Sequence, residues 1–365
     1  MNRCSRRILI TGDAVGGIWT YTLGLIRGLP ETEFALCTMG PAPSVWQRAE
    51  IAALDNASLF VSPYKLEWMD EPWNEVDAAG DWLQEIAADF QPELIHLNGY
   101  VHAALPWNVP VIVAAHSCLL SWWRAVKGAH VPWEFEQYRE RVSRGLAAAD
   151  VVITPSWAML ESLRENYAVP LRARVIYNGH DSSRFSTNHK ARSIFTAGRV
   201  WDEAKNLRAL DLIAPRVAWP IEIAGDLIDS NGRQIILRNA RTFGRLTAAG
   251  IARKLATSSI FALPARYEPF GLSVLEAALS RCALVLGDIP SLHEIWGGAA
   301  LFVSPDDSAG LAHTLNELIR DENLRLDFSK RARKRGRELS LERMAVGYQA
   351  VYDECANGSL TEAAA

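Results

Sequence analysis

The chain has 365 residues, enough for about two domains that each bury a core of their own. Its formal net charge of −4 gives no electrostatic footprint for nucleic acid, and its near-zero mean hydropathy gives no bulk membrane character. Five scattered cysteines without a C-x-x-C pair exclude a disulfide-stapled fold, so we expect a cytoplasmic protein.

The amino-terminal part is typical of a strand, a glycine loop and a helix. The apolar run ILIT after the basic residues 1–7 is too short for a signal-peptide core, and no run reaches membrane-span length. Gly12, Gly16 and Gly17 lack the G-x-G-x-x-G spacing of a dinucleotide fingerprint, and no P-loop G-K-[ST] follows. Gly16 and Gly17 would let a ligand approach the helix N-terminus, and a tight packing turn explains them equally well.

Short apolar runs alternate with longer amphipathic ones along the chain, which is the pattern of βαβ units in parallel sheets. The pattern occurs twice, separated by a polar segment over residues 175–193, and we place the boundary near Asn178. We therefore predict an α/β protein with domains over 1–177 and 178–338, then a helix and a disordered tail (NGSLTEAAA) over 339–365. The predicted strands are RILIT, FALCT, LIHLN, PVIVAAH and VVITP in the first half, and RSIFTAG, IEIAG, IFALP, ALVLG and ALFVS in the second.

His116 ends the predicted strand PVIVAAH, at the same sheet edge as the glycine loop if the first domain is doubly wound. A lone histidine is more often structural than catalytic. Ten of the 13 tryptophans precede Asn178, and their faces suit stacking on a sugar, although core packing explains most of them equally well. The run SWWRAVKG (121–128) mixes aromatic and basic residues and would suit contact with lipid headgroups.

The run GRVWDEAKN predicts a strand that ends at Arg199, a short turn, and a helix opened by Lys205. Ligands bind at strand ends of open α/β sheets, and the two cations can converge on one anion across the turn. Two alternatives stay open: an unspecific surface lysine, and a structural ion pair with Asp202 or Glu203.

The run RYEPFGLSVLEA (266–277) carries two glutamates eight positions apart. Pro269 and Gly271 predict a helix that begins at about Phe270, which leaves Glu268 in the loop beside its N-terminus. Glu276 lies at the rim of the apolar stripe formed by Leu272, Leu275 and Leu279.

The first N–H groups of this helix would meet an anion while both glutamates accept bonds from its hydroxyls, as a phosphate joined to polyols would require. An ordinary half-exposed glutamate explains Glu276 equally well. No metal site is expected, because HEIW at His293 lacks a second histidine and no D-x-D run occurs. The cations and helix ends would then stabilise a leaving diphosphate.

Together the motifs resemble the retaining nucleotide-sugar glycosyltransferases of the GT-B fold, the family 4-like group that contains bacterial mannosyl- and glucosyltransferases. The resemblance runs from about Ile8 to Tyr352, and its most specific element is the glutamate pair after P-x-x-x-E. It implies two Rossmann-like domains facing across a cleft, with the final helix crossing back to the first. The motifs in order are the glycine pair, the strand-end histidine, VIYNG, GRVWDEAKN, PARYEPFGLSVLEA, GDIPSLHE and LFVSPDD.

The resemblance also implies roles for residues of this chain. It makes Arg199 and Lys205 the clamp on the donor diphosphate, Glu276 the acceptor of ribose hydroxyl bonds, and Glu268 the contact to the transferred sugar. The remaining donor and catalytic positions are the N–H groups at Phe270, Gly271 and Leu272, the close approach at Gly16 and Gly17, and His116 near the reacting sugar.

The implied reaction transfers a hexosyl group with retained α configuration to a sugar or lipid-linked glycan acceptor, in polysaccharide or glycoconjugate synthesis. A UDP-glucose-type donor is favoured over GDP-mannose, no metal cofactor is expected, and the diphosphate itself takes the acceptor proton. Ala265 stands where serine is common in the family and Ser117 where aspartate is common, and both departures bear on acceptor chemistry.

Two other classes of function compete. A noncatalytic sugar-nucleotide or glycan-binding protein would keep the fold but should lose some charged site residues. A dinucleotide oxidoreductase is disfavoured by the glycine spacing and by the absence of an acidic residue at the end of FALCT. The implied location is the cytoplasm, with weak peripheral contact at the inner face of the membrane.

Overall fold

The computed structural model describes residues 6–229 and 232–359, so the predicted disordered tail lies mostly outside the described residues. The chain divides into two compact units. Unit 1 comprises residues 1–124, 129–179 and 341–365, and unit 2 comprises residues 125–128 and 180–340. The division falls after Gly179 and again after Ser340, each two residues beyond the boundary expected from sequence.

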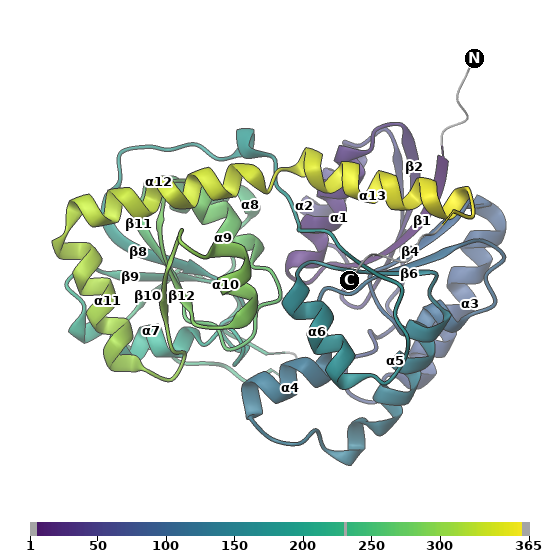
Figure 1. The fold of residues 1–365 in the computed structure, drawn as a ribbon, viewed down its shortest axis with the longest axis horizontal. Helices are drawn as coiled ribbons and strands as arrows, with labels where there is room; N and C mark the ends of the chain where they lie inside the picture. The colour runs from purple at the N-terminus through teal and green to yellow at the C-terminus, as the bar shows by residue number, and fades with distance from the viewer. Residues whose placement is uncertain (1–5, 230–231, 360–365) are drawn as a thin grey trace. The chain divides into compact units, whose positions relative to one another are not determined.

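Unit 1 is built on a parallel sheet (Figure 1). Within the described residues seven strands follow the order β3-β2-β1-β4-β5-β6-β7, and all neighbours are parallel. The order reverses direction between β1 and β4, as in doubly wound folds. The strands are β1 (Arg6–Asp13), β2 (Thr32–Met39), β3 (Ala57–Val61), β4 (Leu94–Leu97), β5 (Val111–Ala114), β6 (Val151–Thr154) and β7 (Ala173–Val175). The helices are α1 (Gly17–Gly28), α2 (Val45–Ala52), α3 (Trp73–Phe90), α4 (Leu119–Lys127, whose last residues group with unit 2), α5 (Glu136–Ala148), α6 (Trp157–Asn166), α13 (Leu341–Ala356) and the 3₁₀ turns η1 (Val101–Ala104) and η2 (Trp133–Phe135).

Unit 2 repeats the architecture with six parallel strands among the described residues, in the order β10-β9-β8-β11-β12-β13. Helix α7 packs with α11, and helix α9 packs with α8 and α12. The strands are β8 (Ala191–Ala197), β9 (Ile221–Ala224), β10 (Arg241–Thr242), β11 (Ser258–Leu263), β12 (Ala283–Gly287) and β13 (Leu301–Val303). The helices are α7 (Leu207–Ile213), α8 (Ala248–Thr257), α9 (Leu272–Leu279), α10 (Pro290–Trp296), α11 (Ser308–Arg320), α12 (Glu322–Glu338) and the 3₁₀ turns η3 (Ser182–Arg184) and η4 (Ala214–Arg216).

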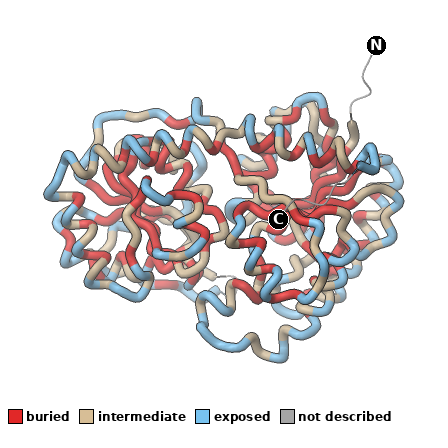
Figure 2. The backbone as a smooth tube through the Cα atoms, in the orientation of Figure 1, coloured by how far each residue is buried: buried red, intermediate tan, exposed pale blue. Residues whose placement is uncertain are grey.

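The central strands form the core of each unit. Figure 2 shows them as buried backbone surrounded by helices with exposed outer faces. Residues 8–10 of β1 and 260–263 of β11 have no solvent-accessible surface. Parallel strands are covered on both faces, so their sequences are continuous apolar runs that can be recognised. All ten predicted strands are present.

The sequence analysis missed strands β3, β7 and β10. Each lies at the edge of its sheet, and their sequences ASLFV, ARV and RT are short or partly polar. An edge strand has one neighbour only and needs no continuous apolar run, so it leaves a weak signal. No helix in the described part of the chain combines the length and apolar character needed to cross a membrane.

Helix α13 returns to unit 1, where it packs against α1 and β4. A buried histidine on β4 holds it there: His96 Nδ1 lies 2.7 Å from the Tyr352 hydroxyl, and Nε2 lies 3.3 Å from the Tyr21 hydroxyl. Burial lowers the pKa of His96 to about 3, so the ring is neutral in neutral solution. A neutral imidazole has one donor and one acceptor nitrogen, and the two hydroxyls can satisfy both.

We expect Tyr352→Phe to lower the free energy of unfolding of unit 1 by about 1–3 kcal/mol, the cost of an unpaired buried polar group. Tryptophan fluorescence in a denaturant titration suits the measurement, because ten of the 13 tryptophans precede Asn178. Val346→Ala is the control, since that side chain is 65% exposed on the same helix. Equal midpoints for Tyr352→Phe and the unsubstituted protein would contradict a structural role for the hydrogen bond.

Candidate functional site

Two of the predicted site residues in unit 2 form an ion pair. Lys205 follows β8 and Glu268 follows β11, and these strands are parallel neighbours, so both loops leave the sheet at the same edge. Lys205 Nζ lies 2.5 Å from Glu268 Oε2, although the residues are 63 positions apart. Both side chains are largely shielded from water, with 19% and 11% of their surface exposed. An anion that approaches Lys205 therefore competes with the Glu268 carboxylate.

Arg199 is paired within its own loop. Its Nη2 lies 2.7 Å from Asp202 Oδ2, and the guanidinium lies 5.2 Å from the ring centre of Trp201. The other oxygen of Asp202 accepts the N–H of Ala204 at 3.0 Å, which stiffens the turn. The ion pair with Asp202 that the sequence left open is thus present, while the guanidinium side chain keeps 35% of its surface exposed.

Helix α9 begins at Leu272, two residues later than the sequence predicted. Gly271 precedes it in the left-handed region, with φ at 89°, so the helical path cannot extend back to Phe270. No side chain caps this end, although the N–H of Val274 bonds the carbonyl of Gly271 at 3.0 Å. The helix start therefore presents the backbone N–H groups of Leu272 and Ser273 without competition from a capping side chain.

The burial of α9 also differs from the predicted stripe. Leu272 is only half-buried, whereas Val274, Leu275 and the following alanines are covered. The helix packs against both α8 and α12, so burial extends around most of it. Gly336 of α12 permits this contact, because an added Cβ there would lie 3.3 Å from the Cβ of Ala278.

Glu276 is half-buried and faces a histidine that the sequence analysis did not single out. Its Oε1 lies 3.6 Å from His180 Nε2, and the backbone N–H of His180 donates to the carbonyl of Leu339 at 3.2 Å. His180 also packs edge-on against Phe185, with ring centres 4.6 Å apart. The only sequence signal for His180 was its place in the polar segment where the first core ends. The contact between His180 and Glu276 orients the glutamate from outside its own helix.

The glycine pair of unit 1 lies where β1 gives way to α1. Gly16 has φ at 73° and is the residue before the helix, and Gly17 is its first residue. Both are exposed. Asp13 Oδ1 accepts the N–H of Val15 at 2.7 Å, which fixes the loop ahead of them. A side chain at position 16 would be strained, so this turn favours glycine.

His116 lies in the loop after β5, two residues past the end of the strand at Ala114 rather than on it. Its Nε2 is 2.9 Å from Asn98 Oδ1, and its ring packs edge-on against Tyr21 with centres 4.2 Å apart. Burial lowers the pKa of His116 to about 4, which leaves the half-buried ring neutral in neutral solution. His116 and the glycine pair both follow strands of one parallel sheet and lie at its carboxyl edge.

The predicted aromatic and lipid-facing groups are dispersed. Trp19 is buried and donates to Glu50 at 3.0 Å, while Trp122 and Trp123 are half-buried and in ring contact with each other. Trp133 is 81% exposed. Three of these four tryptophans therefore pack within the unit, which agrees with the core-packing alternative of the sequence analysis. Trp133 is the one of the four whose ring is open to solvent. Among residues 6–229 and 232–359, no group of three or more histidine, cysteine or acidic residues is placed to hold a metal ion.

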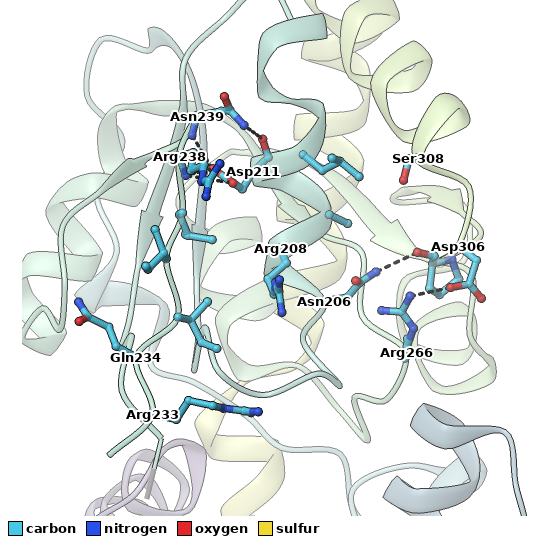
Figure 3. Close-up of a pocket in the computed structure, with 16 residues that line it drawn as sticks. Asn206, Arg208, Asp211, Arg233, Gln234, Arg238, Asn239, Arg266, Asp306 and Ser308 are labelled. Atoms are coloured by element: carbon cyan, nitrogen blue, oxygen red, sulfur yellow. Dashed lines mark hydrogen bonds and ion pairs between the residues drawn. The ribbon is translucent and has the colours of Figure 1, made fainter. Parts of the chain in front are cut away.

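A cavity of about 770 Å³ lies along helix α7 of unit 2 (Figure 3). The Asp211 carboxylate on α7 accepts the backbone N–H groups of Arg238, Asn239 and Ala240 at 2.8–3.1 Å, which holds that segment over the helix. The cavity reaches Asn206 but is not lined by Lys205, Glu268 or Glu276. It is thus distinct from the predicted site residues of unit 2, although Asn206 and Arg266 from the same motif runs line it.

Comparisons with known proteins agree with the two-unit organisation. The model of Glycosyltransferase Family 4 matches residues 15–184, and that of Glycosyl transferases group 1 matches residues 235–335. The glycogen synthase of Mycobacterium tuberculosis is 27% identical over 288 residues, which cover 70% of this chain and 68% of that protein.

Solved structures share the fold at lower identity. Sucrose-phosphate synthase from Thermosynechococcus elongatus has a TM-score of 0.79 at 17% identity, over 97% of this chain and all of that one. Anabaena Alr3699/HepE in complex with UDP-glucose has a TM-score of 0.76 at 15% identity, over 95% and 99% of the two chains. These likenesses confirm the expected α/β GT-B fold with two Rossmann-like domains.

We expect Gly287→Ala to disrupt the loop that carries Glu268. A Cβ at position 287 would lie 2.2 Å from the carbonyl oxygen of Ala265, a backbone atom three residues before the glutamate. Overpacking of this kind typically costs about 1–3 kcal/mol of folding stability, so the melting temperature should fall. Thermal denaturation measures the loss.

Gly198→Ala is the matched control for this substitution. Its added Cβ would lie 3.7 Å from Lys205 Cγ and 3.8 Å from Leu207 Cδ1, which are ordinary van der Waals contacts with side chains. The control should keep the melting temperature of the unsubstituted protein. An equally unchanged melting temperature in Gly287→Ala would show that the Ala265 loop tolerates the added methyl group.

Proposed function

Because the chain belongs to the group 1, family 4-like glycosyltransferases of the GT-B fold, we propose that it transfers a hexosyl group from a UDP-glucose-type donor with retention of configuration. Membership of this family supports nucleotide-sugar glycosyl transfer in general. The identity of the donor, the retention of configuration and the identity of the acceptor are our proposals. The proposed acceptor is a sugar or a lipid-linked glycan in polysaccharide or glycoconjugate synthesis. GDP-mannose is the second candidate donor.

The ion pair of Lys205 and Glu268 is the observation that carries the proposal. It brings a cation and a carboxylate together at one sheet edge, close in sequence to the uncapped start of α9. The cation would suit a phosphate, and the carboxylate would suit sugar hydroxyls. A nucleotide sugar carries both matching groups in one molecule. Arg199 emerges from the same loop as Lys205 and supplies a second cation.

The proposed chemistry uses an exchange of partners. Lys205 moves its charge from Glu268 to the donor diphosphate, and the released carboxylate accepts hydrogen bonds from hexose hydroxyls. The bond between the anomeric carbon and the phosphate oxygen breaks, and its electron pair stays on that oxygen. The acceptor hydroxyl attacks from the same face and gives its proton to the departing diphosphate. Glu276, oriented by His180, accepts bonds from the ribose hydroxyls.

The donor preference follows the comparisons and remains a proposal. The structure of Anabaena Alr3699/HepE contains UDP-glucose, and the sequence relative from M. tuberculosis is a glycogen synthase. Location at the cytoplasmic face of a membrane is likewise proposed, with Trp133 and Arg124 as exposed residues suited to a lipid-linked acceptor.

A noncatalytic sugar-nucleotide or glycan-binding protein is the alternative. The charged set of Arg199, Lys205, Glu268 and Glu276 is complete, whereas a site released from catalysis should lose some of it. Binding of UDP without release of UDP from UDP-glucose in the presence of glycan acceptors would favour this alternative.

We expect the protein to release UDP from UDP-glucose. Lys205→Ala and Arg199→Ala should each lower kcat/KM by a factor that corresponds to about 2–4 kcal/mol of lost transition-state stabilisation, the range for removing one hydrogen-bond donor to developing negative charge. The rate should survive EDTA, because the two cations and the helix start take the role of a metal. Arg208→Ala on the exposed side of α7 is the matched control, since it removes an arginine outside the clamp. Unchanged rates in both clamp variants, or a rate lost in EDTA and restored by Mg²⁺, would overturn the assignment.

We expect Glu268→Gln and Glu276→Gln to affect different steps. Glu268→Gln removes the competitor for Lys205, so UDP should bind at least as tightly while turnover of UDP-glucose falls. Glu276→Gln removes an acceptor for ribose hydroxyls, so UDP binding itself should weaken. Isothermal calorimetry with UDP separates the two, and equal losses of UDP affinity would contradict the division of roles.

A further inference from the structure

Asn98, the residue that follows β4, has an amide group whose orientation is fixed by neighbouring atoms. Its Nδ2 donates to the backbone oxygen of Thr11 at 2.5 Å and to Thr22 Oγ1 at 3.2 Å. Its own N–H donates to Thr11 Oγ1 at 2.8 Å. A carbonyl oxygen only accepts hydrogen bonds, so the amide nitrogen must face Thr11 and Oδ1 must face the other way. That oxygen is the atom that His116 contacts.

The orientation of Asn98 determines which nitrogen of His116 carries the proton. Oδ1 lies 2.9 Å from His116 Nε2, and an amide oxygen is also an acceptor only. Nε2 must therefore be the donor. A neutral imidazole has a single N–H, so Nδ1 is left with a lone pair and no proton.

Nothing in the described part of unit 1 occupies that second nitrogen with a hydrogen bond. The hydrogen bond of His116 goes from Nε2 to the Asn98 amide, its ring packs against Tyr21 in a T-shaped contact, and it lies close enough to His96 to affect the pKa of that ring. His116 is half-buried rather than enclosed. Its Nδ1 atom does not belong to the fully buried side-chain atoms that have no hydrogen-bond partner. Nδ1 therefore reaches a surface where a ligand can bond to it.

We propose that Asn98 is a positioning residue that holds His116 in the Nε2–H tautomer, so that Nδ1 acts as an acceptor for a substrate hydroxyl. In this state His116 cannot donate a proton through Nδ1 to a leaving group. It selects instead for a hydroxyl that donates. The catalytic consequence rests on the proposed glycosyl transfer, whereas the tautomer is a property of the free chain.

The tautomer is measured by nitrogen NMR of the full chain labelled with ¹⁵N-histidine. His116 signals are assigned by their absence in His116→Gln. We expect a pyrrole-like Nε2 and a pyridine-like Nδ1 in the unsubstituted protein, and a mixture of tautomers in Asn98→Ala. Thr22→Val is the control, because Asn98 keeps its bond to Thr11 and its orientation. A pyrrole-like Nδ1 in the unsubstituted protein, or an unchanged pattern in Asn98→Ala, overturns the proposal; the first result decides even if the variant fails to fold.

Turnover of UDP-glucose tests the consequence for catalysis. Asn98→Ala should lower kcat by about tenfold, the effect of one neutral hydrogen bond, with KM little changed. The same substitution in a His116→Ala background should cost little more, because Asn98 acts through the histidine. If the losses of kcat in the two single variants add up in the double variant, Asn98 acts independently of His116, and its proposed role as a positioning residue is overturned. If the unsubstituted protein shows no turnover with any nucleotide sugar, the proposed function fails and the spectrum alone decides the tautomer.

Discussion

The parallel register of the strands is the constraint on which the rest of the structure depends. Every strand of a parallel sheet ends at the same edge, so residues from distant parts of the chain meet there. In unit 1 this brings Asn98 and His116 beside the end of β1. In unit 2 it brings Lys205 to Glu268. Glycines allow the backbones to approach at these crowded ends, as Gly287 does beside Ala265.

The charged residues at the edge of unit 2 are held in ion pairs. An ion pair that is largely shielded from water contributes little net stability, because the loss of hydration offsets most of the attraction. In the proposed reaction, replacing the Glu268 carboxylate beside Lys205 by a phosphate would therefore cost little, and the released carboxylate would gain hydroxyl partners. The Arg199 pair with Asp202 differs, since Asp202 is also bonded to its own loop and has 4% of its side chain exposed. Asp202 fixes its own loop, whereas Glu268 is the partner that Lys205 would exchange in the proposed reaction.

The sequence predicted the central strands and the α/β class, because burial on both faces leaves a clear pattern of apolar runs. It missed edge strands such as β3, which need no continuous apolar run. It placed the start of α9 at Phe270 because the left-handed conformation of Gly271 is not visible in the letters. It grouped Lys205 with Arg199, its neighbour in sequence, and did not foresee the pairing with Glu268. His180 and Asn98 were missed for the same reason: their partners come from remote segments.

The return of α13 to unit 1 has a consequence for how the protein forms on the ribosome. Unit 1 receives Tyr352, the partner of buried His96, only after all of residues 180–340 have been made. At about 5–20 residues per second this interval lasts roughly 10–30 s. During that time the apolar surface of α1 and β4 that α13 later covers stays exposed in the nascent amino-terminal unit. The order of synthesis thus makes the last helix the step that completes the first domain.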